Sequence, residues 1–201
     1  MARGRIAHDN DLAEYTSKRD LKRSGEPSGG RRRGRGNRFV VQRHDASSLH
    51  FDLRLQVGDV LASWAVPKGP SLNPADKRLA VRTEDHPLDY AEFEGRIPEG
   101  EYGAGTMIVW DAGTYRNFTE KDGAEVPIAE AVERGHVVVW LEGKKLTGGF
   151  ALTKFRGEDD WLLVKQDDDG ADRRRRPAKT QPESVRSGRT NEDLEDEDAS
   201  G

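Results

Sequence analysis

Short apolar runs separated by glycine or polar turns dominate the middle of the chain. They occupy residues 38–43, 49–57, 60–66, 78–83, 106–111, 114–118, 136–141, 149–155 and 161–166. Runs of this length, rich in Val, Ile, Leu and aromatic residues, are typical of β-strands. No regular alternation of strands with helices is present, which argues against a parallel sheet. The pattern predicts a mainly β fold, a small antiparallel β-barrel with one or two short helices.

Two segments outside these runs have helical character. Residues 125–134 (EVPIAEAVER) are followed by Gly135, which is a common helix stop. Residues 10–24 place their apolar positions roughly on one side, which favours a short helix there. Glycine and arginine then dominate residues 25–38. That stretch is either a solvated basic linker or a segment that grips nucleic-acid phosphates.

The aromatic residues and the charges divide the chain into three parts. Of the 14 Phe, Trp and Tyr residues, 13 fall within residues 39–166, and only Tyr15 lies outside. The net charge of −4 is distributed as +6 over residues 1–38, −6 over residues 39–166 and −4 over residues 167–201. We therefore expect a basic, partly ordered N-terminal arm at 1–38, a folded barrel domain at 39–166 and a disordered charged tail at 167–201.

Composition excludes several classes of protein. No apolar run approaches the ~20 residues that cross a bilayer, and the N-terminus lacks the apolar stretch of a secretory signal. We therefore expect a cytoplasmic protein with no membrane partner. The chain has no cysteine. A transition metal would consequently be held by His, Asp, Glu or water.

The strand predicted at 49–57 (LHFDLRLQV) carries the most informative pattern. Alternation places its apolar side chains on the core face, and His50, Asp52 and Arg54 on the other face. His44, at the end of the preceding strand, can supply a third ligand. Two histidines and a carboxylate suit Mn²⁺, Fe²⁺ or Zn²⁺, and a neighbouring guanidinium favours a tetrahedral anion. The same residues also fit a solvated strand face with a His–Asp hydrogen bond, so both interpretations remain open on this pattern alone.

A second group of polar residues follows in the sequence. Lys68, Arg78, His86 and Tyr90 are donors of the kind that a phosphate site needs. The dipeptide at 86–87 indicates a turn at the end of a strand. Neither a P-loop nor a G-x-G-x-x-G motif is present, so the glycines at 100, 103 and 105 are expected to shape a turn.

Four sequence blocks resemble one protein family. They are HDASSLHFDLRL (44–55), SWAVPKGPS (63–71), KRLAVRTEDHPLDYAEFEG (77–95) and IPEGEYGAGTMIVWD (97–111). These blocks resemble the 3′-phosphoesterase domain of bacterial and archaeal DNA ligase D, the ligase of non-homologous end joining, and the resemblance runs from about Tyr15 to Gln166. It implies a small β-barrel enzyme, usually Mn²⁺-dependent, with Zn²⁺, Co²⁺ or Fe²⁺ as alternatives. Such an enzyme removes a 3′-terminal ribonucleoside and then hydrolyses the 3′-phosphate to a hydroxyl.

The resemblance also implies roles for individual residues. The metal ligands would be His44, His50 and Asp52. The groups on the scissile phosphate would be Arg54, His86 and Tyr90, with Lys68 and Arg78 as further basic contacts and Gln42 as a supporting residue. The segment KRDLKRSGEP matches the arm of the family, which implies active-site roles for Arg19, Asp20 and Glu26. An ordinary pKa of ~6.5 would make His86 a candidate general acid.

Partners follow from the same resemblance. The substrates would be primer-template 3′ ends that carry a ribonucleotide or a phosphate, and separate ligase, polymerase and Ku-like proteins are candidate partners of a nucleoid-associated enzyme. The ligase motif K-x-D-G is absent, so this chain is not expected to seal nicks itself. The competing hypothesis is a catalytically weak nucleic-acid-binding or scaffolding module of end-joining repair. The intact set of metal and phosphate residues favours the enzyme.

Overall fold

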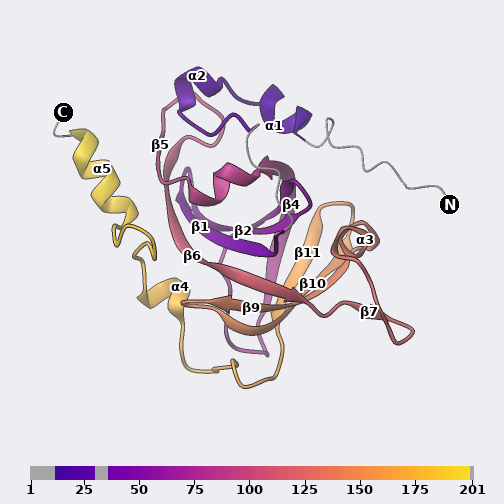
Figure 1. The fold of residues 1–201 in the computed structure, drawn as a ribbon. Helices are drawn as coiled ribbons and strands as arrows, with labels where there is room; N and C mark the ends of the chain where they lie inside the picture. Colours follow the sequence, from indigo (N-terminus) through magenta and orange to yellow (C-terminus); the bar gives the residue numbers. More distant parts are fainter. Residues whose placement is uncertain (1–11, 30–35, 200–201) are drawn as a thin grey trace.

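An eight-stranded antiparallel β-barrel forms the centre of the computed structural model, which describes residues 12–29 and 36–199 (Figure 1). Its strands are β1 (Arg38–Asp45), β2 (Leu49–Val57), β3 (Val60–Val66), β4 (Lys77–Pro87), β6 (Gly105–Asn117), β9 (His136–Gly143), β10 (Thr147–Arg156) and β11 (Asp160–Lys165). Neighbours pair in the order β1-β2-β3-β4-β11-β10-β9-β6, and β6 pairs back with β1 to close the barrel. The predicted fold class is confirmed.

Short strands and helices lie around this barrel. The small strands are β5 (Gly95–Ile97), which pairs with β6, and the hairpin of β7 (Glu120–Lys121) and β8 (Ala124–Glu125). The helices in the described part of the chain are α1 (Ala13–Ser17), α2 (Leu21–Ser24), α3 (Ile128–Arg134), α4 (Pro177–Thr180), α5 (Asn191–Ala199) and the 3₁₀ helix η1 (Leu88–Glu92). None of these helices is long and apolar enough to cross a membrane. Helices are more numerous than predicted because most of them are too short to give a periodic apolar pattern.

Two apolar clusters lie on opposite faces of β1 and β2. The barrel interior holds Phe51, Leu53 and Leu55 of β2, together with three buried tryptophans from other strands (Trp64, Trp110 and Trp161). The second cluster lies outside the barrel, where Val40 of β1 packs with Tyr15 of α1 and Tyr90 of η1. The arm helices and η1 cover this outer face (Figure 1). Strand β2 is therefore buried on both faces, with its apolar residues inside the barrel and its polar residues beneath the arm.

Two strands differ from their predicted bounds in ways that matter for the site. The runs predicted at 106–111 and 114–118 form one strand, β6, which continues through Gly113. Gly113 suits that position because a Cβ there would clash with the Glu142 carbonyl oxygen. Strand β4 extends to Pro87, so His86 lies within the strand, opposite Leu61 of β3, and not in a turn as predicted.

The tail differs from the disorder predicted for residues 167–201. Backbone groups dock it onto the barrel: the Trp110 Nε1–H donates to the Gln181 carbonyl at 2.6 Å, and the Val185 N–H donates to the Val109 carbonyl at 2.9 Å. Farther along, the Asn191 amide donates to the Thr106 carbonyl at 2.8 Å. Composition missed this docking because it depends on main-chain carbonyls, which every sequence provides, and on few apolar side chains.

The arm at 1–38 is described in part. Residues 12–29 run through α1 and α2 over the outer face of the barrel. Asp20 caps α2 by accepting from the Lys22 N–H, and Gly25 ends the helix with a left-handed φ of 69°. The arginine run within residues 30–35 lies outside the described residues.

Replacement of Lys145 by Met will test the docking of the tail. The Lys145 side chain is buried, and its Nζ donates to the carbonyls of Gln181 at 3.1 Å and Glu183 at 2.5 Å. Methionine leaves both carbonyls without this donor, so urea denaturation should show a free energy of unfolding lower by about 1–3 kcal/mol. The matched control is Lys144→Met, because Lys144 is exposed and donates to one tail carbonyl only. Equal losses in the two variants would contradict this account of the docking.

Candidate active site

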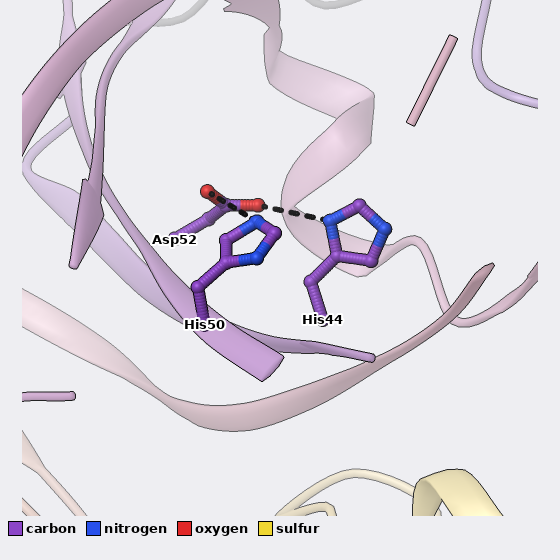
Figure 2. Close-up of side chains that lie close together, drawn as sticks. All are labelled: His44, His50 and Asp52. Atoms are coloured by element: carbon purple, nitrogen blue, oxygen red, sulfur yellow. Dashed lines mark ion pairs between the residues drawn. The ribbon is translucent and has the colours of Figure 1, made fainter. Parts of the chain in front are cut away.

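Two histidines and one aspartate converge at one end of the β1–β2 hairpin (Figure 2). His44 of β1 lies directly opposite His50 of β2 in the antiparallel register. The Asp52 carboxylate reaches both rings, with Oδ2 3.7 Å from His44 Nδ1 and Oδ1 3.7 Å from His50 Nε2. The three candidate ligand atoms all fall within 4.8 Å of one another. The ligand atoms of a tetrahedral metal at ~2.1 Å are roughly 3.4 Å apart, so a small contraction would close this set around an ion.

Backbone carbonyls fix which ring nitrogens face the aspartate. His44 Nε2 lies 2.8 Å from the Gly103 carbonyl oxygen, and His50 Nδ1 lies 3.0 Å from the Ser48 carbonyl oxygen. A carbonyl only accepts, so in the neutral rings these two nitrogens carry the hydrogen. The lone pairs then belong to His44 Nδ1 and His50 Nε2, the two atoms beside Asp52. Metal-bound histidines use their second nitrogen in this way. The residues present therefore fit a divalent metal.

Asp52 is held in its charged form by its neighbours. Burial alone would raise its pKa, but the charge of the Arg54 guanidinium, the largest of the opposing causes, lowers the pKa of Asp52 well below its usual range. The Arg54 Nη2 donates to Asp52 Oδ2 at 3.2 Å. The carboxylate is thus ionised at any pH at which a metal would bind.

Arg54 is itself almost completely buried, with 2% of its surface exposed. Its Nε donates to Gln42 Oε1 at 2.8 Å, and its guanidinium lies 4.8 Å from the centre of the Tyr90 ring. Gln42 is oriented for this contact because its own amide donates to the Tyr90 and Phe93 carbonyls. The Arg54 Nη1 is buried without a protein partner. A buried cation with an unused donor favours an anion at that position.

The arm contributes a second guanidinium. Arg19 donates from Nε to Glu26 at 3.0 Å and from Nη1 to Glu84 at 2.9 Å. Glu26 also accepts from the Tyr90 hydroxyl at 2.8 Å. Burial, followed by the negative charge of Glu26, raises the pKa of Tyr90 well above its ordinary value, although Arg54 opposes the shift. The hydroxyl therefore keeps its proton and remains a donor.

His86 is a neutral imidazole in this environment. Burial, and then the charges of Arg54 and Arg19, lower the pKa of His86 well below its ordinary value. Its Nδ1 lies 2.8 Å from the Glu84 carbonyl oxygen, which makes Nδ1 the donor and leaves the Nε2 lone pair facing Arg19 Nη2 at 3.3 Å. The ordinary pKa on which the general-acid hypothesis rests is therefore absent in the free protein.

A cavity of about 330 Å³ joins these groups. Eight of the expected site residues line it: Arg19, Glu26, His44, His50, Asp52, Arg54, His86 and Tyr90. The other four expected residues do not line it: Asp20, Gln42, Lys68 and Arg78. Gln42 accepts a hydrogen bond from Arg54, which does line the cavity. Asp20 is exposed and caps α2, Lys68 is exposed beyond the end of β3, and Arg78 pairs with Asp76 at 2.8 Å near the start of β4.

Sequence reasoning missed three contributors. Glu84 lines the cavity and forms an ion pair with Arg19. It precedes His86 by two residues on β4, and this spacing could have indicated that the two side chains lie on the same face of the strand. Tyr102 also lines the cavity, and an aromatic residue in a polar glycine-rich loop was the available signal. Gly103 contributes a backbone carbonyl, for which side-chain chemistry gives no signal.

Comparison with known proteins gives a consistent result. Residues 42–154 match the family model described as the DNA ligase D 3′-phosphoesterase domain. The chain is 49% identical over 187 residues to the multifunctional non-homologous end joining protein LigD of Pseudomonas aeruginosa, covering 89% of this chain and 21% of that protein. It is 43% identical over 174 residues to the multifunctional non-homologous end joining DNA repair protein LigD of Mycobacterium tuberculosis, covering 79% and 22% respectively. The chain thus spans about a fifth of the length of these relatives.

Replacement of His50 by Ala will remove one of the three metal-facing groups. Isothermal titration of the purified protein with Mn²⁺ should show an affinity reduced by at least about 100-fold, because a ligand is lost outright. His136→Ala is the matched control, because His136 is an exposed histidine on β9 that contacts Thr153. Undiminished binding by His50→Ala, or an equal loss in the control, would contradict the metal assignment.

The protonation state of His86 is open to direct measurement. At pH 6.5 an ordinary histidine is about half protonated, whereas His86 should be neutral with its proton on Nδ1. Nitrogen NMR of the imidazole rings in the free protein, with His86→Gln to assign the signal, will report both the charge and the tautomer. An imidazolium signal from His86 at pH 6.5 would show that burial and the two guanidinium groups do not lower the pKa of His86 as described.

Proposed function

Because the chain belongs to the DNA ligase D 3′-phosphoesterase family, we propose that it is a metal-dependent enzyme that heals DNA 3′ ends in non-homologous end joining. It removes a 3′-terminal ribonucleoside as a phosphodiesterase and then removes the remaining 3′-phosphate as a phosphomonoesterase. The observation that carries the proposal is the buried Arg54 Nη1 without a partner, in the same cavity as two histidine lone pairs and the Asp52 carboxylate.

The charges of the cavity support a metal requirement. Two guanidinium groups, those of Arg19 and Arg54, line it together with the carboxylates of Glu26, Asp52 and Glu84. With the histidines counted as neutral, the side chains that line the cavity carry a net charge of −1. This negative charge disfavours the binding of a phosphate. A bound divalent cation would make the net charge of the cavity positive. Phosphate binding should therefore depend on the metal, with Mn²⁺ as the ion we propose and Zn²⁺, Co²⁺ or Fe²⁺ as alternatives.

Each residue then has a chemical task. His44, His50 and Asp52 would hold the ion, which supplies Lewis-acid polarisation of a phosphoryl oxygen. Arg54 offers Nη1 to a non-bridging oxygen, and Tyr90 would donate its hydroxyl proton to the phosphate by turning it away from Glu26. We place His86 on the same phosphate, where the negative charge of the substrate would favour protonation of its ring. Arg19 and Glu26 orient Tyr90 and His86 through their hydrogen bonds.

The residues outside the cavity have more distant roles in this proposal. Lys68 and Arg78 would contact the DNA backbone beyond the reacting phosphate, since neither lines the cavity. Asp20 would act on the site only by capping α2 and so placing Arg19. Nick sealing, gap filling and end bridging would fall to separate ligase, polymerase and Ku-like partners.

A primer-template assay tests the proposal. Duplexes ending in one or two 3′-ribonucleotides are incubated with the protein and Mn²⁺, and the primer is followed on a sequencing gel. We expect shortening to a 3′-phosphate and then conversion to a 3′-hydroxyl, with no reaction after chelation or in His50→Ala. If the protein binds the duplex but yields no product with Mn²⁺, Zn²⁺, Co²⁺ or Fe²⁺, the proposed activity is wrong and the binding-module hypothesis replaces it.

Replacement of Arg54 by Lys tests the anion contact in particular. Lysine keeps the positive charge but lacks the planar fork that reaches Gln42, Asp52 and the phosphate together. We expect kcat/KM to fall by about 100-fold or more for both steps. Mn²⁺ affinity is measured alongside to show that the ligands remain in place. Arg116→Lys is the control, because Arg116 is exposed on β6 and does not line the cavity. Activity retained in Arg54→Lys would remove Arg54 from the mechanism.

A further inference from the structure

Tyr102 is an exposed aromatic residue at the mouth of the catalytic cavity. Among the described residues, the large hydrophobic side chains left exposed are Leu49, Leu79, Tyr102, Phe118 and Phe155, and Tyr102 is the one of these that lines the cavity. Its side chain remains 48% exposed. Nothing in the metal or phosphate chemistry above uses it.

Cations of the arm hold the Tyr102 ring in position. The Arg19 guanidinium lies 5.0 Å from the centre of the Tyr102 ring and 4.2 Å from that of Tyr15, so it is packed between two aromatic rings. The Lys18 Nζ lies 5.3 Å from the Tyr102 ring. Cation–π contacts of this kind are attractive and favour this position of the ring. The part of the ring that the arm leaves uncovered is therefore presented at a fixed place.

The backbone around Tyr102 is fixed relative to the metal ligands. The Glu101 N–H donates to the Pro98 carbonyl at 3.2 Å, and the Ala104 N–H donates to the Glu101 carbonyl at 3.1 Å. The next residue, Gly103, accepts from His44 Nε2 at 2.8 Å. Tyr102 thus stands one residue from the carbonyl that orients a candidate ligand. A group whose phosphate lies at His44 would have its neighbouring nucleoside within reach of the ring.

The arm restricts what fits beside Tyr102. Lys18 and Arg19 reach Glu84 on β4, and Arg23 Nε lies 3.3 Å from Glu101 Oε1 in the loop that carries Tyr102. The arm therefore bridges the cavity between β4 and this loop. The cavity measures about 330 Å³, which is on the scale of a single nucleoside and not of a duplex. This side of the cavity suits the terminal nucleoside that is to be removed.

We propose that Tyr102 is the platform on which the base of the 3′-terminal nucleoside stacks. The inference rests on the proposed function, because it names the group that the phosphodiesterase step removes. Stacking on an aromatic face accepts every base, since all four have a π-face. The enzyme would thereby position any terminal nucleoside without reading its sequence.

Kinetics with and without a terminal base test the platform. We compare a primer that ends in a ribonucleotide with one that ends in a base-free ribose. Removal of the base should raise KM about 10-fold for the wild type, and Tyr102→Ala should raise it equally on the base-bearing primer but no further on the base-free one. Tyr102→Phe should resemble the wild type, and Tyr102→Leu should resemble Tyr102→Ala, because leucine has bulk but no π-face.

A primer that already ends in a 3′-phosphate separates stacking from a merely structural role. It has no terminal nucleoside left to stack, so its turnover should be unchanged in Tyr102→Ala. The matched control is Phe118→Ala: Phe118 is 49% exposed and has the Arg116 guanidinium 5.6 Å from its ring, but it does not line the cavity. A parallel loss on the 3′-phosphate primer, or an unchanged KM on the base-bearing primer, would overturn the inference.

A binding measurement without turnover keeps the two proposals distinguishable. A primer-template with 2-aminopurine riboside joined at its 3′ terminus through a non-hydrolysable phosphonate linkage is bound in the presence of Zn²⁺, and the fluorescence of the base is recorded. Stacking predicts quenching in the wild type and in Phe118→Ala, and its loss in Tyr102→Ala. Equal quenching in all three overturns the platform even if the enzyme trims ends. Loss confined to Tyr102→Ala supports the platform even if no trimming occurs and the proposed function fails.

Discussion

The buried guanidinium of Arg54 is the constraint around which the site is organised. Removing a charge from water costs several kcal/mol unless partners replace the lost solvation. Asp52 supplies the opposing charge, Gln42 accepts a hydrogen bond and the Tyr90 ring covers one face. One donor of this cation, Nη1, is left without a protein partner.

The arm is part of the site although it precedes the barrel in sequence. Arg19 and Glu26 come from α1, α2 and the turn after them, yet they complete hydrogen bonds with Glu84, His86 and Tyr90. These contacts help to cover His86 and Tyr90, and burial is the largest cause of the lowered pKa of His86 and of the raised pKa of Tyr90. The arm thus contributes both to the lining of the cavity and to the proton states of the groups in it.

The barrel and its metal-facing residues could be predicted because they depend on alternation. Strand β2 shows the rule: its apolar positions enter the barrel and its polar positions face the cavity. The tail at 167–199 could not be predicted, because main-chain carbonyls accept donors from Trp110 and Lys145 with little help from hydrophobicity. Amino-acid composition describes side chains only, whereas the hydrogen-bond acceptors that hold the tail on the barrel belong to the backbone.

The sequence by itself determined the antiparallel barrel, the placement of His50 and Asp52 on one strand face with His44 at the end of the preceding strand, and the family to which these residues point, because strand periodicity and ordered motifs are local properties. Only the tertiary structure decided which distant groups meet them. It brought Arg19, Glu26 and Tyr102 to the cavity, left Lys68, Arg78 and Asp20 outside it, and made His86 neutral. The packing of segments that are far apart in the sequence determines which groups lie close together, how deeply they are buried and which charges surround them. No short stretch of sequence encodes these properties.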